Sequence, residues 1–165
     1  RDYLFVDRPG FERMVEQNKL LEWATVHGNF YGTPRDDVME RLVAGTDLLF
    51  DIDWQGARQL SAKAEAEAVR VFILPPSAAA LEQRLLGRAQ DGADVIERRL
   101  AGAAEEIAHW GEYHYVIVNE HIPESLARLE AILLAERTRR ERQTGLEPHV
   151  QRLLADLGAR RPQRG

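Results

Sequence analysis

Three short apolar runs constrain the fold of this chain more than any other feature. They are DLLFDID, RVFILPP and YVIVNE, which occupy residues 47–53, 70–76 and 115–120. Each run is almost continuously apolar, which is typical of strands buried on both faces of a parallel sheet. Helical patterns lie between the runs, at about residues 54–68, 77–88 and 92–109. Strands that alternate with helices predict crossover connections and an open α/β sheet.

A smaller mixed region precedes these runs. The stretch DYLFV (2–6) predicts a strand, and the Asp-Arg-Pro that follows it predicts the start of a helix. Next, LLEWATV and NFYG predict two strands joined by a turn that begins at Gly28. Thr33 is predicted to cap the helix that follows, because Pro34 suits the first helical position.

The C-terminal part is predicted to be helical. A long amphipathic helix follows Pro123 and runs to an arginine cluster at 137–142, and Gly145 separates it from a last helix. The leucine stripe of that last helix is interpreted as intramolecular packing, with self-association as the alternative. The length of 165 residues indicates one domain with at most small appendages.

Composition excludes several classes of function. The chain has no cysteine, so it has no disulfide, no thiol nucleophile and no zinc–cysteine site. No apolar run approaches membrane-spanning length and the first residues show no signal-peptide pattern, which predicts a cytoplasmic protein without a membrane partner. A net charge of −5 argues against a nucleic-acid partner, since such partners require a positive field.

Glu22 is an acid inside an apolar run, between Leu21 and Trp23. Two interpretations are open. The acid either points to solvent from an edge strand, or it lies in a pocket and accepts hydrogen bonds from a ligand.

Two further acids follow the first apolar run. Asp51 and Asp53 lie where the predicted strand ends, and ligands of open parallel sheets bind outside the carboxyl ends of the strands. Carboxylates there suit a magnesium ion beside nucleotide phosphates. The alternative is that they cap the next helix.

Four arginines flank a polar turn in RLLGRAQDGADVIERRL; they are Arg84, Arg88, Arg98 and Arg99. Two helices joined by a mobile loop, with guanidinium groups facing inward, would form a lid that brings charge to a transferred phosphoryl group and excludes water. The alternative is a surface helix pair whose arginines pair with neighbouring acids.

These pieces occur in one order that resembles the guanylate kinase family. The matching stretches are DYLFV, LLEWATVHGNFYGTP, LLFDIDWQGA, VFILPPS, LEQRLLGR, IERRL and YVIVN. They cover roughly residues 2–142. The resemblance implies a P-loop nucleoside-monophosphate-kinase-like parallel sheet flanked by helices, with a small mixed GMP-binding subdomain and a helical lid.

The resemblance also implies domain boundaries, which are 1–44 for the GMP-binding subdomain, 45–83 and 105–143 for the core, 84–104 for the lid and 144–165 for a C-terminal helical extension. It implies Mg²⁺-dependent phosphoryl transfer from ATP to GMP, which gives ADP and GDP in purine nucleotide metabolism. The alternative is a catalytically inactive guanylate-kinase-like interaction module. The retained guanine-reading and lid residues favour the enzyme.

The roles of the site residues follow from the same resemblance. Glu22 and Asp53 accept hydrogen bonds from guanine, and the Thr33 hydroxyl approaches the base. Tyr3 and Tyr31 bind the phosphate of GMP. Arg88 and Arg99 are implied to be catalytic lid arginines on the ATP phosphates, and Arg84 is a weaker candidate for the same role. Asp51 is implied to lie near Mg²⁺, with water between them.

One family feature does not occur in these residues. Guanylate kinases carry a first strand and a glycine-rich phosphate loop, and no G-x-x-x-x-G-K-[ST] motif is found in the 165 residues. Because that loop surrounds the transferred phosphate, the 165 residues alone are expected to be inactive.

Overall fold

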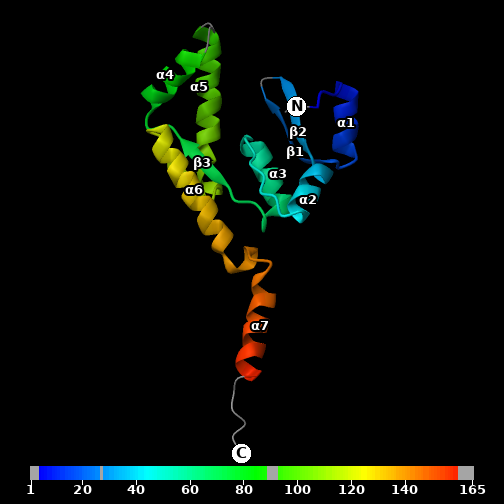
Figure 1. The fold of residues 1–165 in the computed structure, drawn as a ribbon. Helices are drawn as coiled ribbons and strands as arrows, with labels where there is room; N and C mark the ends of the chain where they lie inside the picture. Colours follow the sequence, from blue (N-terminus) through cyan, green and yellow to red (C-terminus); the bar gives the residue numbers. More distant parts are fainter. Residues whose placement is uncertain (1–3, 27, 89–92, 160–165) are drawn as a thin grey trace, which may run out of the picture. The chain divides into compact units, whose positions relative to one another are not determined.

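The computed structural model describes residues 4–26, 28–88 and 93–159 (Figure 1). The chain forms two compact units. One contains Arg1–Phe72 and Ser77–Val116, and the other contains Ile73–Pro76 and Ile117–Gly165.

An antiparallel hairpin organises the N-terminal part of the first unit. Its strands are β1 (Leu20–Val26) and β2 (Asn29–Pro34). Gly28 has a φ of 81° in the turn between them, a conformation that favours glycine. The two strands and the turn predicted from the sequence are therefore confirmed.

Three helices pack on β1, namely α1 (Arg8–Glu16), α2 (Arg35–Val43) and α3 (Trp54–Ala64) (Figure 1). Each helix buries an apolar side chain: Phe11 from α1, Val38 from α2 and Ala57 from α3. The predicted start of α1 is confirmed, since Asp7 Oδ1 accepts a hydrogen bond of 2.9 Å from the backbone N–H of Gly10. Burial of these side chains against β1 holds the hairpin in place.

Two predicted strands are not formed. Residues 47–53 and 4–6 have no regular secondary structure, and Leu49 and Phe5 expose 88% and 91% of their surface. A strand needs a neighbour to satisfy its backbone hydrogen bonds. Within the described ranges, the sheets contain only β1 with β2 and β3 with β4. An apolar run indicates a preference for burial, but it does not supply the strand that must pair with it.

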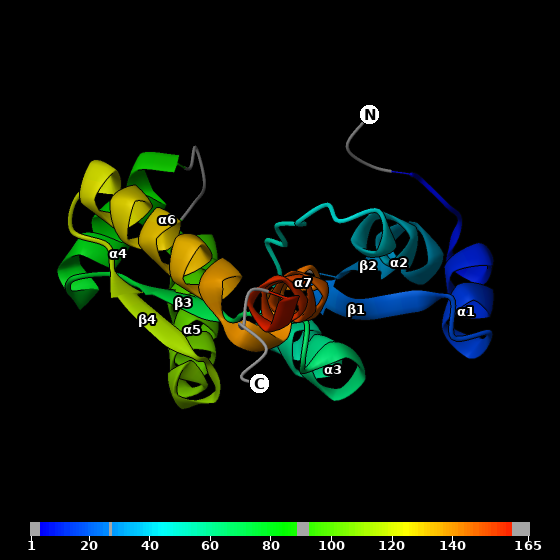
Figure 2. The ribbon, with the colours of Figure 1, turned by 60° about the horizontal axis from the view of Figure 1, so that its bottom comes forward.

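The other two apolar runs form a small parallel sheet (Figure 2). Its strands are β3 (Val71–Leu74) and β4 (Tyr115–Val118). The N–H of Tyr115 donates to the carbonyl of Arg70 at 3.1 Å, and the N–H of Asn119 donates to that of Leu74 at 2.8 Å. Both positions advance by four residues in the same direction, so the strands run parallel. The predicted parallel sheet with helical crossovers is confirmed for this pair.

The crossover between β3 and β4 consists of α4 (Ala78–Arg88), α5 (Ala93–Ala108) and a short 3-10 helix, η1 (Trp110–Glu112). Helices α4 and α5 pack against each other. They are the helix pair that the sequence predicts on either side of the polar turn. The turn itself, at 89–92, lies outside the described residues.

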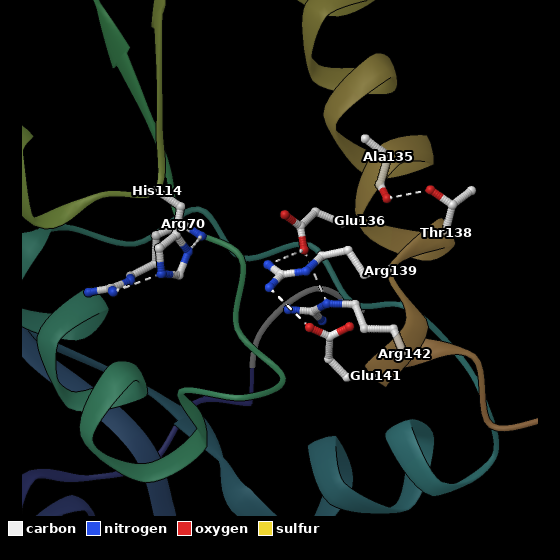
Figure 3. A network of polar contacts seen from close by, with 8 residues as sticks. All are labelled: Arg70, His114, Ala135, Glu136, Thr138, Arg139, Glu141 and Arg142. Carbon is white, nitrogen blue, oxygen red and sulfur yellow. Dashed lines mark hydrogen bonds and ion pairs between the residues drawn. The ribbon is translucent and has the colours of Figure 1, made fainter.

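The second unit is mainly helical, with α6 (Ile122–Thr138), a 3-10 helix η2 (Arg140–Arg142) and α7 (Leu146–Ala159). Glu136 is buried near the end of α6, where its Oε2 lies 3.1 Å from Arg142 and 3.4 Å from Arg139 (Figure 3). These ion pairs fix the turn that follows α6. The predicted intramolecular packing of the α7 leucine stripe is wrong, since Leu154 and Leu157 are 57% and 61% exposed.

None of the helices in the described parts of the chain is long and apolar enough to cross a membrane.

Candidate functional site

Glu22 is the central side chain of the site. It lies in β1 and only 4% of its surface is exposed, so the interpretation as a solvated acid is wrong. The hairpin pairs Glu22 with Thr33 of β2, after a register shift between Leu20 and Glu22. Such a bulge redirects side chains, and Leu20, Leu21 and Glu22 are all buried in succession. The carboxylate is thereby turned into the protein.

Thr33 binds this buried carboxylate. Its hydroxyl donates a hydrogen bond of 2.5 Å to Glu22 Oε1. The prediction that Thr33 caps the next helix is wrong: Pro34 occupies the cap position, and α2 begins at Arg35. Because Thr33 belongs to β2 and pairs with Glu22, its hydroxyl faces the acid instead of the start of the helix.

The first turn of α3 forms the adjoining wall. Asp53 caps this helix, since its Oδ1 accepts a 2.9 Å hydrogen bond from the N–H of Gly56, and its Oδ2 accepts one of 3.0 Å from Gln55 Nε2. A Cβ atom at Gly56 would lie 2.7 Å from Glu22 Oε2. The carboxylate of Glu22 therefore lies against the N-terminal turn of α3, which requires glycine there.

Burial raises the pKa of Glu22. The hydrogen bond from Thr33 opposes this shift, the nearby charge of Asp53 adds to it, and Lys63 opposes it. An acid that is buried and only partly compensated is typical of a functional site, because a ligand with hydrogen-bond donors can complete it.

The raised pKa of Glu22 predicts a pH-dependent contribution to stability. Between 4.5, the ordinary pKa of this side chain, and its higher value in the folded chain, the folded state binds more protons than the unfolded state. The free energy of unfolding should therefore fall as the pH rises through this interval, and the loss is complete above the folded pKa. Glu22→Gln, which does not titrate, should lack this component.

Urea unfolding of both proteins across this pH range measures the effect as the wild-type free energy of unfolding minus that of Glu22→Gln. The difference should decrease with rising pH. A difference that is constant or increases would show that the Glu22 carboxylate is not destabilised by burial.

Tyr31 and Asp51, which are predicted to bind GMP and magnesium, are less enclosed than Glu22. Tyr31 lies in β2 and is 47% exposed. Tyr3 lies outside the described residues. Asp51 is exposed, two residues before Asp53. Among residues 4–26, 28–88 and 93–159, no three histidine or acidic side chains are grouped to hold a metal. The single exposed carboxylate of Asp51 suits a magnesium ion whose other ligands are phosphate and water oxygens. It does not make a metal site held by protein ligands alone.

The predicted lid arginines belong to α4 and α5. Arg84 is exposed on α4, and Arg99 is partly buried on α5. Arg88 is the last residue of α4, and its side chain lies outside the described parts. The structure thus groups the side chains of Glu22, Thr33 and Asp53 near the start of α3. It places the predicted lid arginines on the helix pair α4 and α5.

Two residues near Glu22 and Asp53 are not predicted from the sequence. Gly56 contacts Glu22, and Glu106 of α5 accepts a 3.0 Å hydrogen bond from the N–H of Trp54, next to Asp53. The glycine in DIDWQG could have been noticed as a close approach at a helix start. Glu106 has no local signal, because it lies 52 residues from its partner in the sequence.

A parallel sheet with helical crossovers, a mixed hairpin region with a buried acid and an arginine-bearing helix pair define an α/β fold of the nucleoside-monophosphate kinase type. Residues 1–136 match the protein family described as guanylate kinase. The chain belongs to the guanylate kinase family.

Individual relatives agree with this assignment. A guanylate kinase of Bradyrhizobium diazoefficiens is 55% identical over 157 residues, which are 95% of this chain and 72% of the relative. A guanylate kinase of Nitrobacter winogradskyi is 56% identical with the same coverage. The crystal structure of guanylate kinase from Anaplasma phagocytophilum superimposes with a TM-score of 0.75 at 40% identity, over 90% of this chain and 72% of that one. These relatives support an enzyme over the alternative of an interaction module.

Proposed function

We propose that the pocket around Glu22 binds the guanine base of GMP, and that the family chemistry of this chain is phosphoryl transfer from ATP to GMP, which gives ADP and GDP. The observation that supports this proposal is the buried carboxylate of Glu22, with the Thr33 hydroxyl on one oxygen and Asp53 beside it. A guanine base could supply further hydrogen-bond donors to an acid in this environment.

Guanine presents two donors on its Watson–Crick edge, N1–H and the exocyclic amine, whereas adenine has an acceptor at N1. We assign the N1–H and the amine to Glu22, with Asp53 assisting at the amine. Adenine in the same place would leave the carboxylate of Glu22 buried and unpaired, which costs about 1–3 kcal/mol or more. This difference would give selectivity for GMP over AMP.

The phosphate ends of the substrates have their own proposed ligands. Tyr3 and Tyr31 would donate hydrogen bonds to the phosphate of GMP. Arg88 and Arg99, with Arg84 as a weaker candidate, would bind the phosphates of ATP and stabilise the charge that develops during transfer. Asp51 would orient water on a magnesium ion, which when bound neutralises charge on the phosphates.

A further part of the proposal concerns activity. Phosphoryl transfer depends on positioning and on charge around the transferred group. The 165 residues contain no glycine-rich phosphate loop motif. We therefore propose that this polypeptide by itself binds GMP but transfers phosphate very slowly.

Calorimetric titration of GMP and AMP into the 165-residue chain tests the base assignment. GMP should bind at least tenfold more tightly than AMP, which corresponds to about 1.4 kcal/mol. Equal affinities would contradict the role of the pocket. The same sample, in an assay coupled to ADP formation, should show no GMP-dependent turnover; a typical kinase rate of about 1–100 per second would contradict the proposed inactivity.

A further inference from the structure

Helix α3 contacts α5, His109 and η1 through its residues Trp54 and Arg58. The backbone N–H of Trp54 donates a 3.0 Å hydrogen bond to Glu106 Oε1 of α5. The indole of Trp54 stacks on the imidazole of His109, with ring centroids 4.0 Å apart and planes inclined by 22°. Arg58 donates two hydrogen bonds to Glu112 of η1, at 2.5 and 2.6 Å.

Among these contacts, the one made by Glu106 is to the backbone of the residue that follows Asp53. Trp54 is the first residue of α3, and Asp53 is its cap. Asp53 accepts from Gly56, two residues after Trp54, so the two carboxylates bind two of the N–H groups that the start of a helix leaves unpaired. Burial raises the pKa of Glu106, and the nearby charge of Asp53 raises it further. The two carboxylates are therefore close enough to interact.

We propose that Glu106 is a positioning residue for guanine recognition: by accepting the Trp54 N–H, it fixes the backbone from which Asp53 reaches the exocyclic amine. The assignment rests on the proposed function, because Asp53 must contact the amine for its position to matter. Two kinds of contact hold α3 to the same neighbours without Glu106, namely the Trp54–His109 stack and the Arg58–Glu112 pair. Loss of Glu106 should therefore shift Asp53 without separating the helices.

The proposal predicts a change in base discrimination, which a general loss of packing would not produce. Inosine monophosphate has the N1–H of guanine but no exocyclic amine, so the ratio of its Kd to that of GMP measures the contact at the amine. Removal of a hydrogen bond that positions Asp53 should reduce this ratio by about threefold to tenfold. Binding of inosine monophosphate itself should change little.

Three variants of Glu106 separate the reach of the side chain from its charge. Glu106→Gln keeps an oxygen at the same reach and should retain the wild-type ratio. Glu106→Asp keeps the charge but is one methylene shorter, and it should lower the ratio, as should Glu106→Ala. Glu105→Ala is the matched control, because Glu105 is an exposed acid on the same helix, and it should leave the ratio unchanged.

Calorimetric Kd values for GMP and inosine monophosphate, with circular-dichroism melts of each variant, give the result. The proposal is overturned if Glu106→Asp keeps the ratio, or if Glu106→Gln loses it while folded. If Glu106→Ala does not fold, the comparison of Gln with Asp still decides.

Asp53→Ala separates this inference from the proposed function. If Asp53→Ala lowers the ratio and Glu106→Asp does not, only the positioning role fails. If Asp53→Ala leaves the ratio unchanged, the assignment of Asp53 to the amine fails as well.

Discussion

Glu22→Gln is expected to lower the affinity for GMP by about tenfold to a hundredfold, because a hydrogen bond to a charged partner contributes about 1.5–3 kcal/mol. The amide retains one acceptor oxygen, which can still receive the hydrogen bond of Thr33. Its NH₂ group would then face the donors of guanine, and two donors repel each other. Calorimetric titration of GMP into the purified variant measures the loss.

The stability of Glu22→Gln should change in the opposite direction. Burial raises the pKa of Glu22, so a neutral side chain suits this position better than a carboxylate at neutral pH. The free energy of unfolding should be equal to that of the wild type or higher, while binding is lost. A variant that is less stable and binds GMP weakly would indicate a structural role, and one that binds GMP normally would remove Glu22 from the site.

Glu16→Gln is a suitable control for this substitution. Glu16 is an exposed acid at the end of α1, so its replacement makes the same change in net charge on the same unit. It should alter neither the affinity for GMP nor the stability by more than about 0.5 kcal/mol. A comparable loss of binding in both variants would point to net charge instead of a specific contact.

The hairpin could be predicted from sequence because its signals are local. Alternating and apolar residues mark β1 and β2, and a glycine marks the turn between them. In the structure that glycine, Gly28, has a positive φ. The acid at position 22 was visible for the same reason, since a carboxylate in an apolar run is unusual. Whether it faced solvent or the protein interior depended on a bulge and on α3, and neither is a local feature.

Other parts of the fold depend on partners that the sequence does not indicate. Residues 70–76 and 47–53 have similar apolar patterns, yet only the first contains a strand, because β4 pairs with it. Thr33 resembles a helix cap in sequence, but its strand position directs the hydroxyl to Glu22. Glu106 of α5 accepts its hydrogen bond from Trp54, 52 residues away in the sequence, and no periodicity or motif indicates that contact. The roles of the arginines on α4 and α5 remain a prediction from family resemblance.

Gly56→Ala should reduce the affinity for GMP by about tenfold while it changes the free energy of unfolding by less than about 1 kcal/mol. The added Cβ would lie 2.7 Å from Glu22 Oε2 and 3.3 Å from the Cβ of Ile52. The carboxylate is held on its other oxygen by Thr33, so it can move away only by weakening that hydrogen bond. Weakening that hydrogen bond lowers the stability, and the higher helix propensity of alanine offsets part of this loss. It does not restore the position of the Glu22 carboxylate.

Gly102→Ala distinguishes displacement of Glu22 from a general effect of alanine in a helix. Gly102 lies in α5, and a Cβ there would have no atom within 4 Å. Its replacement should raise the free energy of unfolding by about 0.5–1 kcal/mol and leave the Kd for GMP unchanged. Normal GMP binding by Gly56→Ala would show that the acid is not fixed against α3 in the bound state. Weak binding confined to Gly56→Ala would show that recognition of the base requires the Glu22 carboxylate where the first turn of α3 now places it.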